Sequence, residues 1–213
     1  MGRDHTIASR YCCQDGIDSI QSRMSDGPPD SSVPAPPAST RLRDLLDRLA
    51  RVVASEGWRD DLNPTQRAAL LYLTRPNRFS RAPSHVADYL LATRGTVSQT
   101  LKALARKGLV EEVRSDADRR SFSYEATAAG RALAKRHGAV DAAAENLGDT
   151  SALEAELTSL LRAMLAEREQ RSFGVCATCR HHRSDANGVR CALLGVTLQP
   201  LEATQLCHEH EVA

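Results

Sequence analysis

Residues 93–126 read TRGTVSQTLKALARKGLVEEVRSDADRRSFSYEA, and this stretch decides the fold. Apolar side chains recur in its first half at steps of four and three residues, namely Val97, Leu101 and Leu104. This spacing predicts a helix from about residue 95 to residue 107, which Gly108 ends. Two short alternating segments follow, near 110–114 and 121–126, and the polar residues 115–120 separate them. Such a pattern is typical of a β-hairpin.

The residues upstream predict further helices. Ser84 is the expected cap of a helix with Val86, Ala87, Leu90 and Leu91, and residues 92–94 form the turn before the next helix. Asn63 and Pro64 begin an earlier helix, whose expected core side is Ala68, Leu70, Leu71 and Leu73. A leucine-rich helix runs from residue 41 and ends at Gly57. The order helix, turn, helix, hairpin predicts a mainly α fold with a small β-hairpin wing, a winged helix-turn-helix.

The side of the 95–107 helix opposite the apolar stripe is polar and cationic. At 100° per residue it presents Thr96, Gln99, Lys102 and Arg106. In a DNA major groove Gln can pair with adenine, and Lys or Arg can reach guanine or phosphate. The hairpin adds Arg114, Arg119 and Arg120, which can enter a minor groove, with Asp118 holding an Arg in position. An ordinary solvated surface is the alternative at both places.

Charge is distributed unevenly over a chain whose formal net charge is +1. Residues 41–140 contain 19 Lys and Arg against 11 Asp and Glu, whereas residues 141–213 contain six Arg against 11 acidic residues. The middle of the chain is therefore the part suited to a polyanion.

Three stretches together resemble the MarR family of transcription regulators: LNPTQRAALLYL at 62–73, SHVADYLLATRGTVSQTLKALARKGLVEEV at 84–113 and SDADRRSFSYEATAAGRAL at 115–133. The resemblance covers roughly residues 41–170. It implies a homodimer that binds double-stranded DNA at a palindromic operator as a repressor, relieved by a small-molecule or redox effector. By position it implies Thr96, Ser98, Gln99 and Lys102 as recognition-helix residues, with Arg119 and Arg120 in the wing. Many family members have Arg where this chain has Gln99, so the preferred bases can differ.

The helices that follow the hairpin are expected to form a dimer. A long helix is predicted from near Thr127 to a break around 148–150, and a second from 151 to 171 that Thr150 or Ser151 caps together with Glu154. The second has an exposed leucine stripe that needs a partner, although the same stripe could cover the core of its own chain. We assign residues 41–172 to the DNA-binding and dimerisation domain.

Residues 1–40 are expected to be a disordered arm, because 25–40 are rich in Pro and Ser and almost free of bulky apolar side chains. Cys12 and Cys13 lie in this arm, and their sequence context assigns them no role.

Residues 173–213 form the third expected domain, a cysteine-rich metal-binding module. Cys176 and Cys179 make a C-x2-C pair, and Cys191 and Cys207 complete a set of four. Four thiolates suit a structural zinc ion or an iron–sulfur cluster, and a metal would stabilise a segment too short for a full core. Free thiols are the alternative. His181, His182, His208 or His210 could replace a cysteine, although each is more typical of a surface or supporting group.

The sequence favours a DNA-binding transcription regulator over two other classes. A protein-interaction adaptor, with the winged helix as a dimer platform and the cysteine module as the binding part, is the alternative. An enzyme is disfavoured, because the sequence has no Gly-rich phosphate loop and no persuasive nucleophile–base pair. No apolar run approaches a membrane helix and no signal peptide is evident, so we expect a cytoplasmic protein.

Overall fold

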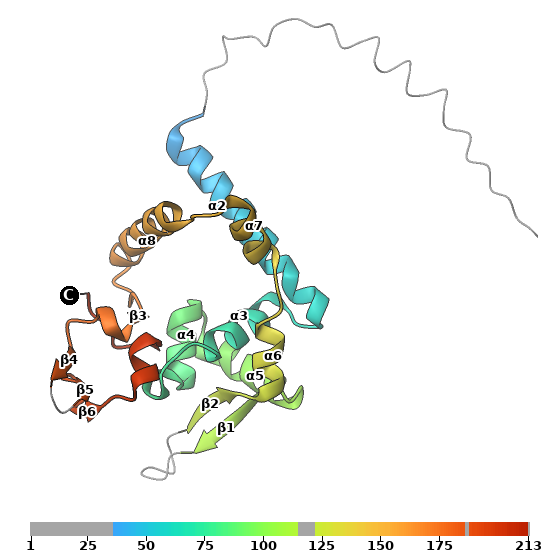
Figure 1. Cartoon of the computed structure of the whole chain (residues 1–213). Helices are drawn as coiled ribbons and strands as arrows, with labels where there is room; N and C mark the ends of the chain where they lie inside the picture. Colours follow the sequence, from blue (N-terminus) through green and yellow to red (C-terminus); the bar gives the residue numbers. More distant parts are fainter. Residues whose placement is uncertain (1–35, 115–121, 186–187, 213) are drawn as a thin grey trace, which may run out of the picture. The chain divides into compact units, whose positions relative to one another are not determined.

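The elements follow the predicted order in the computed structural model, which describes residues 36–114, 122–185 and 188–212, without the Arg59 side chain (Figure 1). The winged-helix part and its flanking helices consist of α2 (Ala38–Ser55), η1 (Glu56–Asp60), α3 (Pro64–Leu73), η2 (Arg78–Ser80), α4 (Pro83–Leu90), α5 (Arg94–Arg106), β1 (Val110–Arg114), β2 (Phe122–Ala126), α6 (Ala128–Ala134), α7 (Ala139–Leu147) and α8 (Ser151–Ala166). The chain divides into two units at Leu45–Leu46, inside α2.

The C-terminal segment forms small antiparallel sheets that the sequence pattern did not predict. Its elements are β3 (Gly174–Val175), η3 (Cys176–Thr178), β4 (His182–Asp185), β5 (Gly188–Cys191), β6 (Val196–Thr197), η4 (Pro200–Thr204) and β7 (Leu206–Cys207). Strand β3 pairs with β7, and β4, β5 and β6 form a three-stranded sheet in that order.

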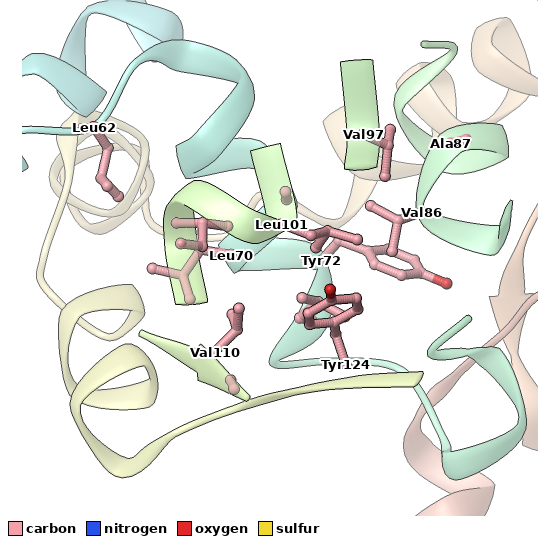
Figure 2. Packing of buried hydrophobic residues seen from close by; sticks show 13 residues of the cluster. Leu62, Leu70, Tyr72, Val86, Ala87, Val97, Leu101, Val110 and Tyr124 are labelled. Atoms are coloured by element: carbon pink, nitrogen blue, oxygen red, sulfur yellow. The ribbon is translucent and has the colours of Figure 1, made fainter. Parts of the chain in front are cut away.

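One apolar core joins α3, α4, α5 and the hairpin (Figure 2). Val97, Leu101 and Leu104 of α5 are fully buried in it, so the predicted inner face of this helix is confirmed. Thr93 caps α5 by accepting a hydrogen bond from the Thr96 amide, and Gly108 follows the helix with φ +69°. The apolar stripe and the cap therefore fix which side of α5 faces outward.

Two details of the upstream helices correct the sequence predictions. Helix α4 begins at Pro83 with Ala82 as its N-cap residue, and not after Ser84, because proline is well suited to the first helical turn. The buried side of α3 is Ala69, Leu70, Tyr72 and Leu73. Ala68 and Leu71, predicted for the core, are only half-buried. The capping box of Asn63 with Gln66 supports the predicted start of α3.

The predicted break at 148–150 is confirmed, because α7 ends at Leu147 and α8 begins at Ser151. A second break, which was not predicted, falls at 135–138 between α6 and α7, where the Glu56 side chain accepts a hydrogen bond from the Ala139 amide. Thr150 and Ser151 form no capping box with Glu154; the Asp149 carboxylate instead accepts from the Ser151 amide and hydroxyl. Helix α8 ends at Ala166, five residues before the predicted end.

Gly130 explains the segment TAAG that follows the hairpin. The Thr127 hydroxyl donates to the Gly108 carbonyl over 2.7 Å and accepts from the Gly130 amide over 3.1 Å. A Cβ atom on Gly130 would lie 2.0 Å from the Leu109 carbonyl oxygen. Helix α6 therefore approaches the start of β1 more closely than any side chain at position 130 permits.

We predict that Gly130→Ala lowers the free energy of unfolding by about 1–3 kcal/mol, because the backbone of α6 or β1 must move. Gly95→Ala is the matched control, since its added Cβ meets no atom nearer than 3.9 Å and helical Ala is favoured over Gly. Urea unfolding measures both. Equal stability of Gly130→Ala and the wild type would contradict the close approach.

Helices α2, α7 and α8 have no buried residue. Their large apolar side chains are exposed instead, among them Leu49 on α2, Leu147 on α7 and Leu153, Leu157 and Leu161 on α8. No helix of the described residues is long and apolar enough to span a membrane.

Candidate nucleic-acid interface and cysteine centre

The predicted recognition residues lie on the outer side of α5. Thr96, Gln99, Lys102 and Arg106 are exposed, and Ser98 is half-buried. The Thr96 hydroxyl lies 2.9 Å from the Thr93 hydroxyl, so this residue belongs to the helix cap as well as to the outer surface. Gln99 and Lys102 thus offer an amide and a cation beside each other on a helix held from behind by its leucines.

The wing strands pair from Val110↔Ala126 to Arg114↔Phe122. Arg114 is exposed, with its Nε 3.5 Å from a Glu112 carboxylate oxygen. Arg81 anchors the hairpin to the body of the domain, because it pairs with Glu125 at 2.5 Å and its carbonyl accepts from the Tyr124 amide. Asp118, Arg119 and Arg120 of the predicted arginine tip lie outside the described residues.

All four C-terminal cysteines are buried and free, with Cys176 4%, Cys179 8%, Cys191 8% and Cys207 6% exposed. The first two form a tight turn in which the Cys179 amide donates to the Cys176 carbonyl over 3.0 Å. The Glu211 amide donates to Cys179 Sγ over 3.5 Å. Cys191 and Cys207 enter from separate strands, β5 and β7. Four separate chain positions therefore contribute buried thiols to one small module.

The thiols influence one another electrostatically. Burial, with smaller contributions from the thiols of Cys207, Cys191 and Cys179, raises the pKa of Cys176 to about 11. Burial also raises the pKa of Cys207, although hydrogen bonds from the Asn77 side chain, the Glu209 amide and the Ser80 side chain act in the opposite direction. Several thiolates are thus disfavoured here unless a cation compensates their charge, which is what a bound metal supplies.

Another group lies at the edge of this module. The ligand atoms of His85, His208 and Glu209 all lie within 4.8 Å of one another, and among the described residues the four thiols do not form a group this close. Sulfurs around a tetrahedral zinc ion would be about 3.8 Å apart, given Zn–S bonds of about 2.3 Å.

The histidines fit supporting roles. His208 places one ring nitrogen 2.9 Å from Asp88 and the other 3.0 Å from Glu209, and its ring stacks on His85 with centroids 3.9 Å apart. Because the two rings are nearly parallel, their in-plane lone pairs converge poorly on one ion, and the present arrangement suits a contact between α4 and the module. The His210 ring packs on Gly174, and its Nε2 lies 3.0 Å from the Thr178 hydroxyl. His181 and His182 are half-buried.

The cysteine module is bound directly to the loop between α3 and α4. The Leu206 amide donates to the Arg75 carbonyl over 3.0 Å, and the Leu206 carbonyl accepts from the Asn77 amide over 2.9 Å. Phe173 adds edge-to-face contacts with Tyr72 and Tyr89. Sequence reasoning missed this junction, because neither Asn77 nor Ser80 has a spacing that relates it to a cysteine more than a hundred positions away.

An apolar cavity of about 680 Å³ lies within the second unit. Its lining comes from the end of α2, from α3 and α4, from the start of α5 and from α8, and it includes Leu46, Val53, Leu71, Leu90 and Leu157. The half-buried residues Ala68 and Leu71, which the sequence placed in the core, line this cavity.

Comparison with known proteins identifies the relatives of the winged-helix part. A model of the MarR family matches residues 60–121. S. aureus MepR in a DNA-binding conformation is 20% identical with a TM-score of 0.52, over 62% of this chain and 98% of that chain. The S. aureus MepR–DNA complex is 20% identical with a TM-score of 0.50, over 62% and 99%. Streptococcus pneumoniae FabT in complex with DNA is 25% identical with a TM-score of 0.46, over 62% and 97%.

The two MepR structures have the fold of the 62% of this chain that they cover. No curated protein matches the chain. The family model thus matches a shorter stretch than the resemblance at 41–170. The four cysteines lie beyond the residues that the family model matches.

Proposed function

We propose that this protein is a DNA-binding transcription regulator of the MarR type that binds a palindromic operator as a homodimer and represses from it. The carrying observation is the outer side of α5, where Gln99, Lys102 and Arg106 are exposed opposite a fully buried Val97, Leu101 and Leu104. An outward amide with two cations is suited to base edges and phosphates in a major groove. The DNA complex of MepR, with the same fold, supports this reading.

Operator selection from a pool of random-sequence duplexes, followed by a gel shift at several salt concentrations, tests the proposal. We expect one enriched palindrome whose binding weakens steeply as salt rises, because phosphate contacts release counterions. A protein-interaction adaptor would enrich no sequence. Failure to enrich any duplex with the full-length chain would refute the regulator.

We propose that α2, α7 and α8 form the dimer interface. Each has large exposed apolar side chains and no buried residue, and such stripes are costly to leave in water. An operator with two-fold symmetry would then match a two-fold symmetric protein.

We predict that Leu153→Glu/Leu161→Glu on α8 converts the dimer to a monomer, because each change would bury a charge in the interface. Both leucines are about half exposed in the single chain, at 50% and 53%, so the fold should tolerate them. Ser159→Glu, exposed on the same helix but outside the stripe, is the control. Light scattering after gel filtration gives the mass; an unchanged dimer of the leucine variant would exclude α8 from the interface.

We propose that Cys176, Cys179, Cys191 and Cys207 hold a metal, either zinc or an iron–sulfur cluster. Their burial and their number in one module support this, because four sulfur donors are the ligand set that zinc and iron–sulfur clusters both take. The metal would stabilise the module. We further propose the apolar cavity beside α3 as the place for a small-molecule effector, since its lining is mostly aliphatic.

A further inference from the structure

The loop between α3 and α4 holds the chain on both sides of Cys207. Before the cysteine, Leu206 exchanges two backbone hydrogen bonds with Arg75 and Asn77. After it, the His208 amide donates to the Ser80 hydroxyl oxygen over 2.9 Å. Of the four cysteines, Cys207 is thus the one whose two neighbours are both bonded to the winged-helix part.

This loop is itself rigidly connected to the helices that position α5. Asn77 and Ser80 are each only 1% exposed, and the Tyr72 hydroxyl of α3 donates to the Ser80 carbonyl over 2.6 Å. The Asn77 side-chain oxygen accepts from the Phe79 amide and from the Ser80 hydroxyl. A displacement of residues 206–208 would therefore reach the loop that leads into α4.

Two further contacts bind the module to the same region. Arg78 Nη1 lies 2.6 Å from both carboxylate oxygens of Glu202, whose side chain is 8% exposed, and Arg78 Nη2 donates to the Thr197 carbonyl. His208 meets Asp88 of α4 at 2.9 Å. An ion pair with one buried partner is sensitive to small changes in geometry, because the buried carboxylate has no solvent to replace its partner.

From these contacts we infer that Cys207 is the coupling ligand: metal binding at the four thiols and operator binding by α5 are linked through the α3–α4 loop. This inference rests on the proposed function and names how its metal site would regulate it. A metal held by the four thiols would fix the segment around Cys207, and this segment is bonded to the helix-turn-helix on both sides of the cysteine.

Thermodynamic linkage relates the affinity for zinc to the affinity for the operator. If zinc changes operator affinity, the operator must change zinc affinity by the same factor, and couplings between sites are commonly about 5- to 150-fold. We expect zinc to strengthen operator binding by a factor in this range, because a closed module would hold α4, and through it α5, in one position.

The test compares operator dissociation constants of the full-length protein with zinc and after chelation. The double variant Arg78→Gln/Glu202→Gln removes the ion pair without leaving a charge buried. The single variant Ser80→Ala removes the hydroxyl that accepts from the His208 amide. We expect the double variant and Ser80→Ala each to bind one equivalent of zinc but to lose most of the zinc-dependent change in operator affinity. Arg180→Gln/Glu211→Gln, a pair at 3.2 Å inside the module, is the matched control and should keep the full effect.

The outcomes separate the inference from the function. Wild-type protein that binds zinc and shifts the operator equally with and without it would overturn the coupling and leave the regulator intact. The coupling would also be overturned if Arg78→Gln/Glu202→Gln and Ser80→Ala both kept the wild-type change in operator affinity on zinc binding. No operator shift in either state would instead refute the proposed function, and no zinc binding would refute the four-thiol site. Zinc affinity, measured by competition with a chromophoric chelator in the presence and absence of operator, must give the same factor.

Discussion

Gln99→Ala/Lys102→Ala is expected to weaken operator binding by at least about tenfold while the protein remains a dimer. One good contact between a side chain and a base is worth about 1–3 kcal/mol, and a dimer loses it in both half-sites. Both residues are exposed and neither contributes to the core, so the fold and the dimer should be unaffected. A gel shift gives the affinity, and gel filtration gives the oligomeric state.

Arg168→Ala is the control for lost positive charge, because Arg168 is exposed just after α8 and outside the helix-turn-helix. The two residues of the test should also separate. Lys102→Ala alone should weaken binding to all DNA sequences equally and make the affinity less dependent on salt concentration. Gln99→Ala should instead relax the preference for one base pair. Unchanged affinity of the double variant would remove α5 from the DNA interface.

The sequence predicted the winged helix well because local patterns determine it. Repeats of three and four residues identified the buried residues of α5, and the predicted turn at 92–94 and Gly108 placed its ends within one or two positions. Errors arose where two local signals competed: Ser84 was a plausible cap, but Pro83 already occupied the first turn. The face of α3 was misjudged by one position, because Ala68 and Leu71 line a cavity instead of the core.

The break between α6 and α7 could not be predicted from the local sequence. It depends on Glu56, which lies far upstream, accepts from the Ala139 amide and pairs with Arg67 at 2.7 Å. Gly138 permits this approach, since a Cβ there would lie 2.7 Å from a Glu56 carboxylate oxygen. The sequence contains the glycine, but only the folded chain shows which carboxylate comes near it.

The sequence predicted the cysteine module in part. The spacing of the cysteines predicted that they would serve one site, and the structure buries all four. Its strands of two to four residues are too short to show an alternating pattern. The module is attached to Asn77 and Ser80, which lie far from it in the chain, so the sequence could not predict this contact. Across the expected boundary at residue 173, hydrogen bonds on both sides of Cys207 join the module to the winged-helix part.

Cys176→Ser/Cys179→Ser is expected to reduce bound metal from one site per chain to none and to lower the thermal stability of the module. Serine preserves size but its hydroxyl is a poor ligand for the metals that thiolates bind, and removing two of four ligands from a small module removes most of its binding free energy. Metal analysis after anaerobic purification measures the loss. The absorption spectrum of the wild type then separates the two metals, since an iron–sulfur cluster is coloured and zinc is not.

Cys12→Ser/Cys13→Ser is the matched control, with the same chemical change outside the four-cysteine module, and should keep the full metal content. Unchanged metal in the Cys176→Ser/Cys179→Ser variant would place the ligands elsewhere. The first group to test would then be His85, His208 and Glu209, whose ligand atoms already lie within 4.8 Å of one another. Loss of metal in His85→Ala but not in the cysteine variant would assign the metal to the junction with α4, and the four thiols would be a buried cluster without an ion.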